Sequence, residues 1–128
     1  MTTAAAVTVA VLLGGVAVFQ VLLAAGARWG HYAYGGRLAG PGEPLPARYR
    51  IVSAVAVLVL AAMAWTVLAA AGLVSYPGGE RLVVWLVFGY LVLNTAGNLA
   101  SPTRFERFGM GALTAVAAVL TLLVALTA

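Results

Sequence analysis

The sequence has few side chains that could carry out chemistry: one histidine, three glutamates, no aspartate and no cysteine in 128 residues. The lack of cysteine excludes disulfides, thiol catalysis and thiolate metal sites. His31 and the glutamates Glu43, Glu80 and Glu106 are too scattered to predict a metal site within one chain. No nucleophile elbow, phosphate-binding loop or pair of haem histidines occurs. The sequence therefore predicts no catalytic residues, no metal and no cofactor, and an enzyme is the less favoured interpretation.

Two amides, Asn94 and Asn98, lie near the end of an apolar stretch within "LNTAGNLASPTRFER", residues 93–107. Residues four positions apart share one face of a helix, and Tyr90 and Ser101 extend the same stripe. An amide left unpaired in lipid costs about a few kcal/mol. We therefore expect this stripe to face other helices rather than lipid.

Polar residues on the other apolar stretches fall at a similar depth, namely Gln20, Ser53 and Thr114. One interpretation is that these groups hold the helices together by hydrogen bonds. A second is a polar-lined pocket or pore that opens toward the cytoplasm, and a third is an oligomer interface. The candidate ligand-binding or pore-lining residues are Gln20, Trp29, Tyr34, Arg50, Ser53, Tyr90, Asn94, Thr95, Asn98 and Ser101.

The composition places these residues in a membrane protein, because 64% of the chain is hydrophobic, 8% is charged, and the mean hydropathy is +1.08. Stretches of about 18 or more apolar residues can span a bilayer. The predicted spans cover residues 4–27, 51–73, 82–100 and 109–126, in one domain, 1–128. Short loops make successive helices antiparallel, so we predict an all-α transmembrane bundle of four antiparallel helices. Ala25-Gly26-Ala27 also fits a signal-peptidase site, but the missing basic region before the first span favours a retained helix.

Arginine counts predict the orientation, because positively charged loops stay in the cytoplasm. The first and third loops contain six arginines and the second contains one; they are Arg28, Arg37, Arg48, Arg50, Arg104 and Arg107 against Arg81. Both termini are then extracytoplasmic. The lack of lysine, with abundant Ala, Val and Gly, indicates a GC-rich bacterial genome and thus the bacterial inner membrane. The net charge of +4 suits contact with anionic membrane lipids, and no feature predicts nucleic-acid binding.

Charged residues flank the spans instead of lying at their centres, which argues against ion pumps and proton-coupled transporters. Arg48, Arg104, Glu106 and Arg107 are interpreted as an interfacial charge cluster that anchors the bundle to lipid phosphates. Glu106 is expected to pair with Arg48 or Arg50 across the cytoplasmic rim. The long first loop, residues 28–50, is rich in Gly and Pro, so no regular helix is predicted there.

The segments "GARWGHYAYGGR", "LPARYR" and "NLASPTRFER" together resemble a family of small four-helix bacterial integral membrane proteins. The resemblance covers nearly the whole chain and implies the four-helix fold but no activity. The matching positions are Gly26, Ala27, Trp29, Gly30, Gly35, Gly36, Leu45, Pro46, Arg50, Asn98, Leu99, Ser101, Glu106 and Arg107. Similarity to fluoride channels and small multidrug exporters is limited to size and helix number.

Three functions fit these observations. The first is a binding or scaffold protein, as a single chain or as a homo-oligomer. It would hold a lipid or small apolar ligand near the cytoplasmic face. Its cavity would be rimmed by Trp29, Tyr34, Arg50, Asn94 and Asn98. The second is an oligomeric channel or passive facilitator lined by Asn94, Thr95 and Asn98, since uncharged polar linings suit passive permeation. The third is an accessory subunit of a larger membrane complex.

Overall fold

The computed structural model describes residues 1–128 and consists of four long antiparallel helices without strands. They are α1 (Thr2–Ala24), α2 (Ala47–Ala70), α3 (Glu80–Leu99) and α4 (Gly111–Thr127), the last of which continues a π-helical turn, η3 (Phe105–Met110). All four spans, the fourth counted from Phe105 to Thr127, are long and apolar enough to cross a membrane. The predicted all-α transmembrane bundle of four antiparallel helices is confirmed, and the helices indicate a multi-pass membrane protein.

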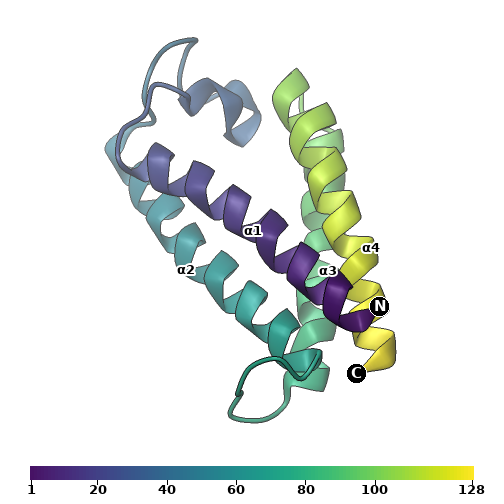
Figure 1. Ribbon diagram of the computed structural model, residues 1–128. Helices are drawn as coiled ribbons and strands as arrows, with labels where there is room; N and C mark the ends of the chain where they lie inside the picture. The colour runs from purple at the N-terminus through teal and green to yellow at the C-terminus, as the bar shows by residue number, and fades with distance from the viewer.

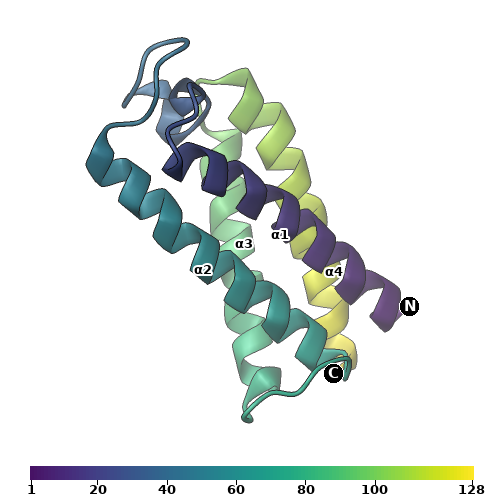
Figure 2. The ribbon, with the colours of Figure 1, turned by 60° about the vertical axis from the view of Figure 1, so that its left-hand side comes forward.

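The four helices form a ring in which each helix packs against two neighbours, α1 against α2 and α4, and α3 against α2 and α4. Figures 1 and 2 show α1 and α2 as one tilted pair lying across the pair formed by α3 and α4. Both chain termini lie at one end, where the hydroxyls of Thr2 and Thr127 are 2.9 Å apart. The other end, formed by residues 25–50 and 100–110, carries six of the seven arginines and is called the arginine-rich end below.

Two helices end three residues earlier than the sequence predicts, and a glycine is the cause in each. The spans predicted to reach residues 27 and 73 end at Ala24 and Ala70. Gly26 adopts φ +97 and Gly72 adopts φ +78, the left-handed conformation that ends a helix. The amide of Gly26 donates to the carbonyl of Leu23, and the next amide donates to Leu22, which is the Schellman pattern.

All four helices begin earlier than predicted, α2 and the fourth span by four residues each, so charges assigned to loops lie in helical turns. α2 begins at Ala47, directly after Pro46, rather than at Ile51, and its first turns therefore include Arg48 and Arg50. The fourth span begins at Phe105 rather than Gly109, which places Glu106 and Arg107 inside η3. α3 ends at Leu99, before Ser101-Pro102, because the residue preceding a proline disfavours helix.

The tightest packing lies in the half of the bundle nearer the chain termini. Small and β-branched side chains from all four helices fill this core, among them Val9, Val67, Val84, Ala117 and Val124, each fully buried. Such side chains let helices approach closely. Toward the arginine-rich end the two helix pairs move apart, and the first loop lies between them (Figure 1).

The first loop is packed rather than extended, and it includes two short 3-10 turns that the sequence did not predict, η1 (Gly30–Tyr32) and η2 (Tyr34–Gly36). Leu45 and Ala33 of the loop pack on Leu23 of α1 in a second small core. Gly30 allows this fold-back, since a Cβ there would lie 2.9 Å from the backbone nitrogen of Leu45. This packing holds η1 and η2 over the space between the helix pairs.

Candidate ligand-binding cavity

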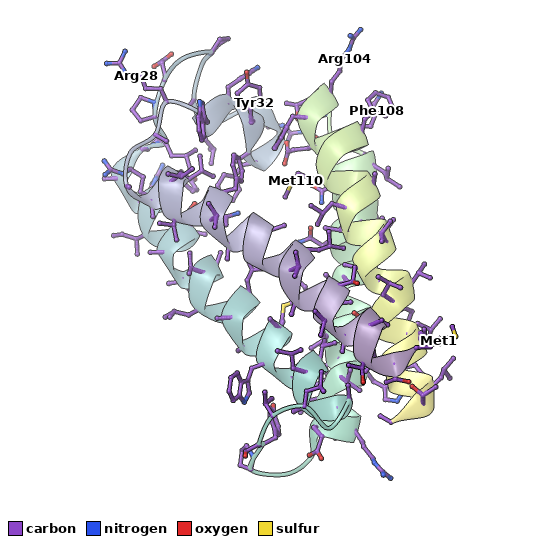
Figure 3. All side chains as sticks on the ribbon, in the orientation of Figure 1. Met1, Arg28, Tyr32, Arg104, Phe108 and Met110 are labelled. Carbon is purple, nitrogen blue, oxygen red and sulfur yellow. The ribbon has the colours of Figure 1, made fainter.

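A cavity of about 300 Å³ lies between the two helix pairs beneath the first loop. Helices α1, α2, α3 and α4, together with η1, η2 and η3, all contribute to its wall. Its apolar lining consists mainly of Leu13, Val16, Phe19, Leu60, Leu91 and Met110. Figure 3 shows Met110 extending from its helix toward the interior, below Tyr32 of the first loop. Below Leu13 and Leu60 the closely packed core begins, so the cavity is closed toward the chain termini.

The polar part of the lining gathers at the arginine-rich end. It consists of Gln20, Tyr32, Tyr34, Tyr90, Asn94, Asn98, Glu106 and Thr114. The sequence predicted that Gln20 and Thr114 lie at the depth of the Asn94–Asn98 stripe, and the cavity brings these four side chains together. The arrangement is amphipathic, with an apolar floor and a polar rim.

Glu106 holds the rim together. Its Oε1 atom accepts three hydrogen bonds, from the Gly35 amide at 2.8 Å, the Ser101 hydroxyl at 2.8 Å and the Thr103 hydroxyl at 3.0 Å. The first loop is thereby tied to the connection between α3 and α4. The expected pairing with Arg48 or Arg50 is not formed; the partners of this carboxylate are hydroxyls and one amide, because Glu106 faces inward from η3 rather than along the lipid rim.

Glu106, expected from the sequence to be an interfacial anchor, lies instead in the cavity wall. A signal was present in Thr103-x-x-Glu106, which fits the Ser/Thr-x-x-Glu pattern of a helix start. The Thr103 hydroxyl accepts from the Glu106 amide at 3.3 Å, as an N-terminal capping residue does. A helix beginning there directs the Glu106 side chain back toward the end of α3.

Tyr34 enters the cavity through an uncommon backbone conformation. Its φ is +54, in the left-handed region that non-glycine residues rarely adopt, and Gly35 and Gly36 follow at φ +72 and +73. The Tyr34 hydroxyl lies 3.4 Å from that of Ser53, which is fully buried in α2. Backbone strain of this kind costs about 1 to 3 kcal/mol and persists where surrounding contacts enforce it. Here the contacts are the Ser53 hydroxyl and the bond from Gly35 to Glu106.

The amides in the cavity do not link helices to one another. Asn98 Nδ2 donates to Asn94 Oδ1 at 2.9 Å, a bond within α3. Gln20 Oε1 is buried and has no hydrogen-bond partner in the protein. An unpaired buried acceptor costs about 1 to 3 kcal/mol, so Gln20 is retained at the cavity despite a cost in stability.

Two threonines, unlike the amides, form a hydrogen bond between helices. Thr95 Oγ1 donates to Thr114 Oγ1 at 2.9 Å across α3 and α4. Thr95 lies outside the lining of the cavity, unlike Asn94 and Asn98. The three residues predicted to line one pore therefore divide between the cavity and a helix contact.

Two predicted rim residues, Trp29 and Arg50, lie away from the cavity. Trp29 is 46% exposed on the outside of the first loop. Arg50 Nε donates to the Ala24 carbonyl at 3.1 Å and so closes the end of α1. Its guanidinium lies against Gly26, where a Cβ would be 3.1 Å from Nη2.

Four further arginines also lie outside the inner cavity. Arg107 Nε donates to the Ser101 carbonyl at 3.2 Å, beyond the end of α3, and Arg48 lies 5.1 Å from the ring centre of Tyr49. Figure 3 shows Arg28 and Arg104 pointing away from the bundle at the same end. Their outward direction suits contact with phosphate groups or water.

A second, more open cavity of about 650 Å³ adjoins the first beside α3. The two share Tyr34, Tyr90, Asn94, Asn98 and Glu106. Its other lining residues include Arg37, Leu93, Gly97, Ser101 and Pro102, so Ser101 belongs here rather than to the inner cavity. Leu93 is 74% exposed on the outer face of α3. The polar rim is therefore reached from the side of the bundle, next to an apolar helix face.

The cavity offers binding groups rather than a reactive constellation. Its single ionisable carboxyl group is that of Glu106, and no group of three or more His, Cys, Asp or Glu side chains is placed to hold a metal ion. No protein-family model, curated protein or solved structure matches the chain significantly.

Proposed function

We propose that this protein binds a small amphipathic molecule of the membrane, a lipid or lipid-like compound, in the cavity between its helix pairs. The single observation that carries the proposal is the division of that cavity into an apolar floor and a polar rim. Cavities of about 300 to 1,000 Å³ with mostly apolar walls and a few convergent polar groups are typical of small-molecule sites. The apolar tail would lie against Leu13 and Leu60, and the polar head would lie near Glu106 and Asn98.

The side opening gives such a molecule a route from the bilayer. The outer cavity begins beside the exposed Leu93 and continues to Asn94, Asn98 and Glu106 at the inner rim. A ligand that diffuses at the membrane interface would keep its head at this level while its tail turns inward. The closed core beneath the cavity favours binding over permeation through a single bundle.

The orientation we propose follows the arginines and sets the cavity at the cytoplasmic face of a bacterial inner membrane, with both termini outside. The chain lacks cysteine, so single cysteines report their side directly. Ala39→Cys in the first loop should stay unlabelled by a membrane-impermeant maleimide in intact cells, and Ser75→Cys should be labelled. The reverse pattern would show the opposite orientation.

The binding proposal is tested by filling the cavity. Ala56 of α2 lines it, and Ala54, two positions earlier on the same helix, is exposed on the outer surface. Native mass spectrometry of the protein in a neutral detergent with added membrane lipid extract should show a stoichiometric adduct on the unchanged protein. Ala56→Phe should remove the adduct, because the new ring occupies the cavity, and Ala54→Phe should retain it.

Equal adducts on the unchanged protein and both variants would place binding on the outer surface and contradict the proposal. An unchanged protein that carries no adduct would contradict it as well. Circular dichroism and elution volume in gel filtration serve as checks that the two variants have the same fold.

A further inference from the structure

We infer that the head of the ligand is a protonated amine, so that the cavity selects amphipathic alkylammonium compounds over neutral and anionic ones; the inference rests on the proposed function. Glu106 is the only charged residue that lines the inner cavity, and no arginine lines it. A carboxylate removed from water requires an opposite charge or several hydrogen-bond donors.

Only half of the Glu106 carboxylate is supplied with donors. All three hydrogen bonds from the protein go to Oε1. The protein supplies no donor to Oε2. Arg50 and Arg107 donate to the carbonyls of Ala24 and Ser101, and Arg37 lines the outer cavity without an ion pair to Glu106. One carboxylate oxygen in the wall is thus left for a group that the ligand brings.

Free carbonyl oxygens lie on the rim beside this carboxylate. Gln20 Oε1 is buried without a donor. In the Asn94–Asn98 pair, Asn98 Nδ2 donates to Asn94 Oδ1, which leaves the carbonyl oxygen of Asn98 and the amide nitrogen of Asn94 free. An ammonium has three N–H donors and no acceptor, and therefore complements a set of unpaired acceptors next to a carboxylate.

Aromatic rings complete the environment of the head. Tyr32 and Tyr34 from the first loop and Tyr90 from α3 line the same rim. Tyr32 packs edge-on against Phe105 at 5.4 Å, which keeps its ring in place over the cavity. The faces of such rings attract cations and do not attract anions. Charge, hydrogen bonding and ring faces thus select the same class of ligand.

The test uses three probes of equal chain length with different heads: decylammonium, decanol and decyl sulfate. Binding of each to the intact protein in neutral detergent is measured by native mass spectrometry at neutral pH. We expect decylammonium to bind at least about tenfold more tightly than the other two, as one charge-assisted hydrogen bond implies. Glu106→Gln, which keeps an oxygen acceptor for Gly35, should remove this preference. Glu80→Gln at the opposite end of the bundle is the matched control and should leave it unchanged.

Two kinds of failure are distinguishable. If the three probes bind equally and Ala56→Phe still blocks them, the cavity binds amphiphiles and the charge selection is wrong. If Ala56→Phe blocks the binding of none of the probes, both the proposed function and the charge selection are wrong. A preference for decylammonium that survives in Glu106→Gln also overturns the inference, since the carboxylate would not be its cause.

A last arm identifies the source of the amine. Phosphatidylethanolamine also carries a primary ammonium on an apolar body, whereas phosphatidylcholine has no N–H donor. Phosphatidylethanolamine that displaces decylammonium, with phosphatidylcholine inactive, assigns the site to a lipid headgroup. Displacement by neither lipid assigns it to a free alkylamine, and equal displacement by both contradicts recognition of the N–H donors.

Discussion

Replacing Glu106 by alanine should release the first loop from the connection between α3 and α4. The carboxylate accepts bonds from Gly35, Ser101 and Thr103 at 2.8, 2.8 and 3.0 Å. A hydrogen bond to a charged group contributes about 1.5 to 3 kcal/mol. Three full bonds would overstate the loss, because the Ser101 and Thr103 hydroxyls also lie 3.3 Å apart and can bond to each other.

The Gly35 amide has no such replacement, so its bond and part of the other two are lost. We therefore expect Glu106→Ala to lower the free energy of unfolding by about 2 to 4 kcal/mol. Glu106→Gln, which retains an acceptor, should lower it by about 1 kcal/mol. The quantity is measured by titrating the detergent-solubilised protein with sodium dodecyl sulfate and following circular dichroism.

Glu43→Ala is the matched control, because Glu43 is a glutamate of the first loop and its side chain is exposed. Surface substitutions of this kind change stability by about 0.5 kcal/mol or less. If Glu106→Ala behaves like Glu43→Ala, the carboxylate does not tie the two connections together. If Glu106→Gln costs as much as alanine, charge rather than hydrogen-bond acceptance is responsible.

Three further substitutions test the same geometry. Gln20→Leu should raise the free energy of unfolding by about 1 kcal/mol in the same titration, because the buried Oε1 atom has no partner. It should also weaken amphiphile binding. A loss of stability would show that Gln20 is paired. The double change Asn94→Leu with Asn98→Leu should alter stability by less than about 1 kcal/mol, since the hydrogen bond between the two amides lies within α3. It should abolish amphiphile binding. A loss of stability as large as that expected for Glu106→Ala would indicate hydrogen bonds between helices. Gly26→Ala should cost about 1 to 2 kcal/mol because of its φ of +97, whereas Gly14→Ala, with open space around its Cβ, should not destabilise; equal effects would remove the conformational explanation.

The sequence predicted the four helices because long apolar runs have few alternatives in a chain with so little charge. It placed helix ends less well, since hydropathy continues through Gly26 and Gly72 while the backbone turns there. It also treated Arg50 as part of a loop, although Pro46 allows a helix to start immediately after it. Local stop and start signals therefore decide the boundaries that hydropathy leaves open.

The candidate site was predicted in part. Helical spacing and depth brought Asn94, Asn98, Gln20 and Thr114 together, as in the structure. Glu106 was missed, because its direction depends on the η3 turn and on a partner amide in the distant first loop. The places of Tyr32, Phe19 and Met110 in the cavity wall were missed for a related reason. The crossing of the two helix pairs decides which helix faces surround the cavity. Periodicity within one helix does not encode this crossing.

The bond from Gly35 to Glu106 joins residues that are 71 positions apart, while Tyr34–Ser53 and Thr95–Thr114 each join residues 19 apart. Each helix pair can therefore assemble from contacts that are close in sequence, and the cavity wall is completed only when the pairs dock. Contacts that form late in folding act mainly on the unfolding rate. A ligand that fills the cavity, or the Glu106 bond itself, should thus delay separation of the two pairs while leaving the rate of their assembly nearly unchanged.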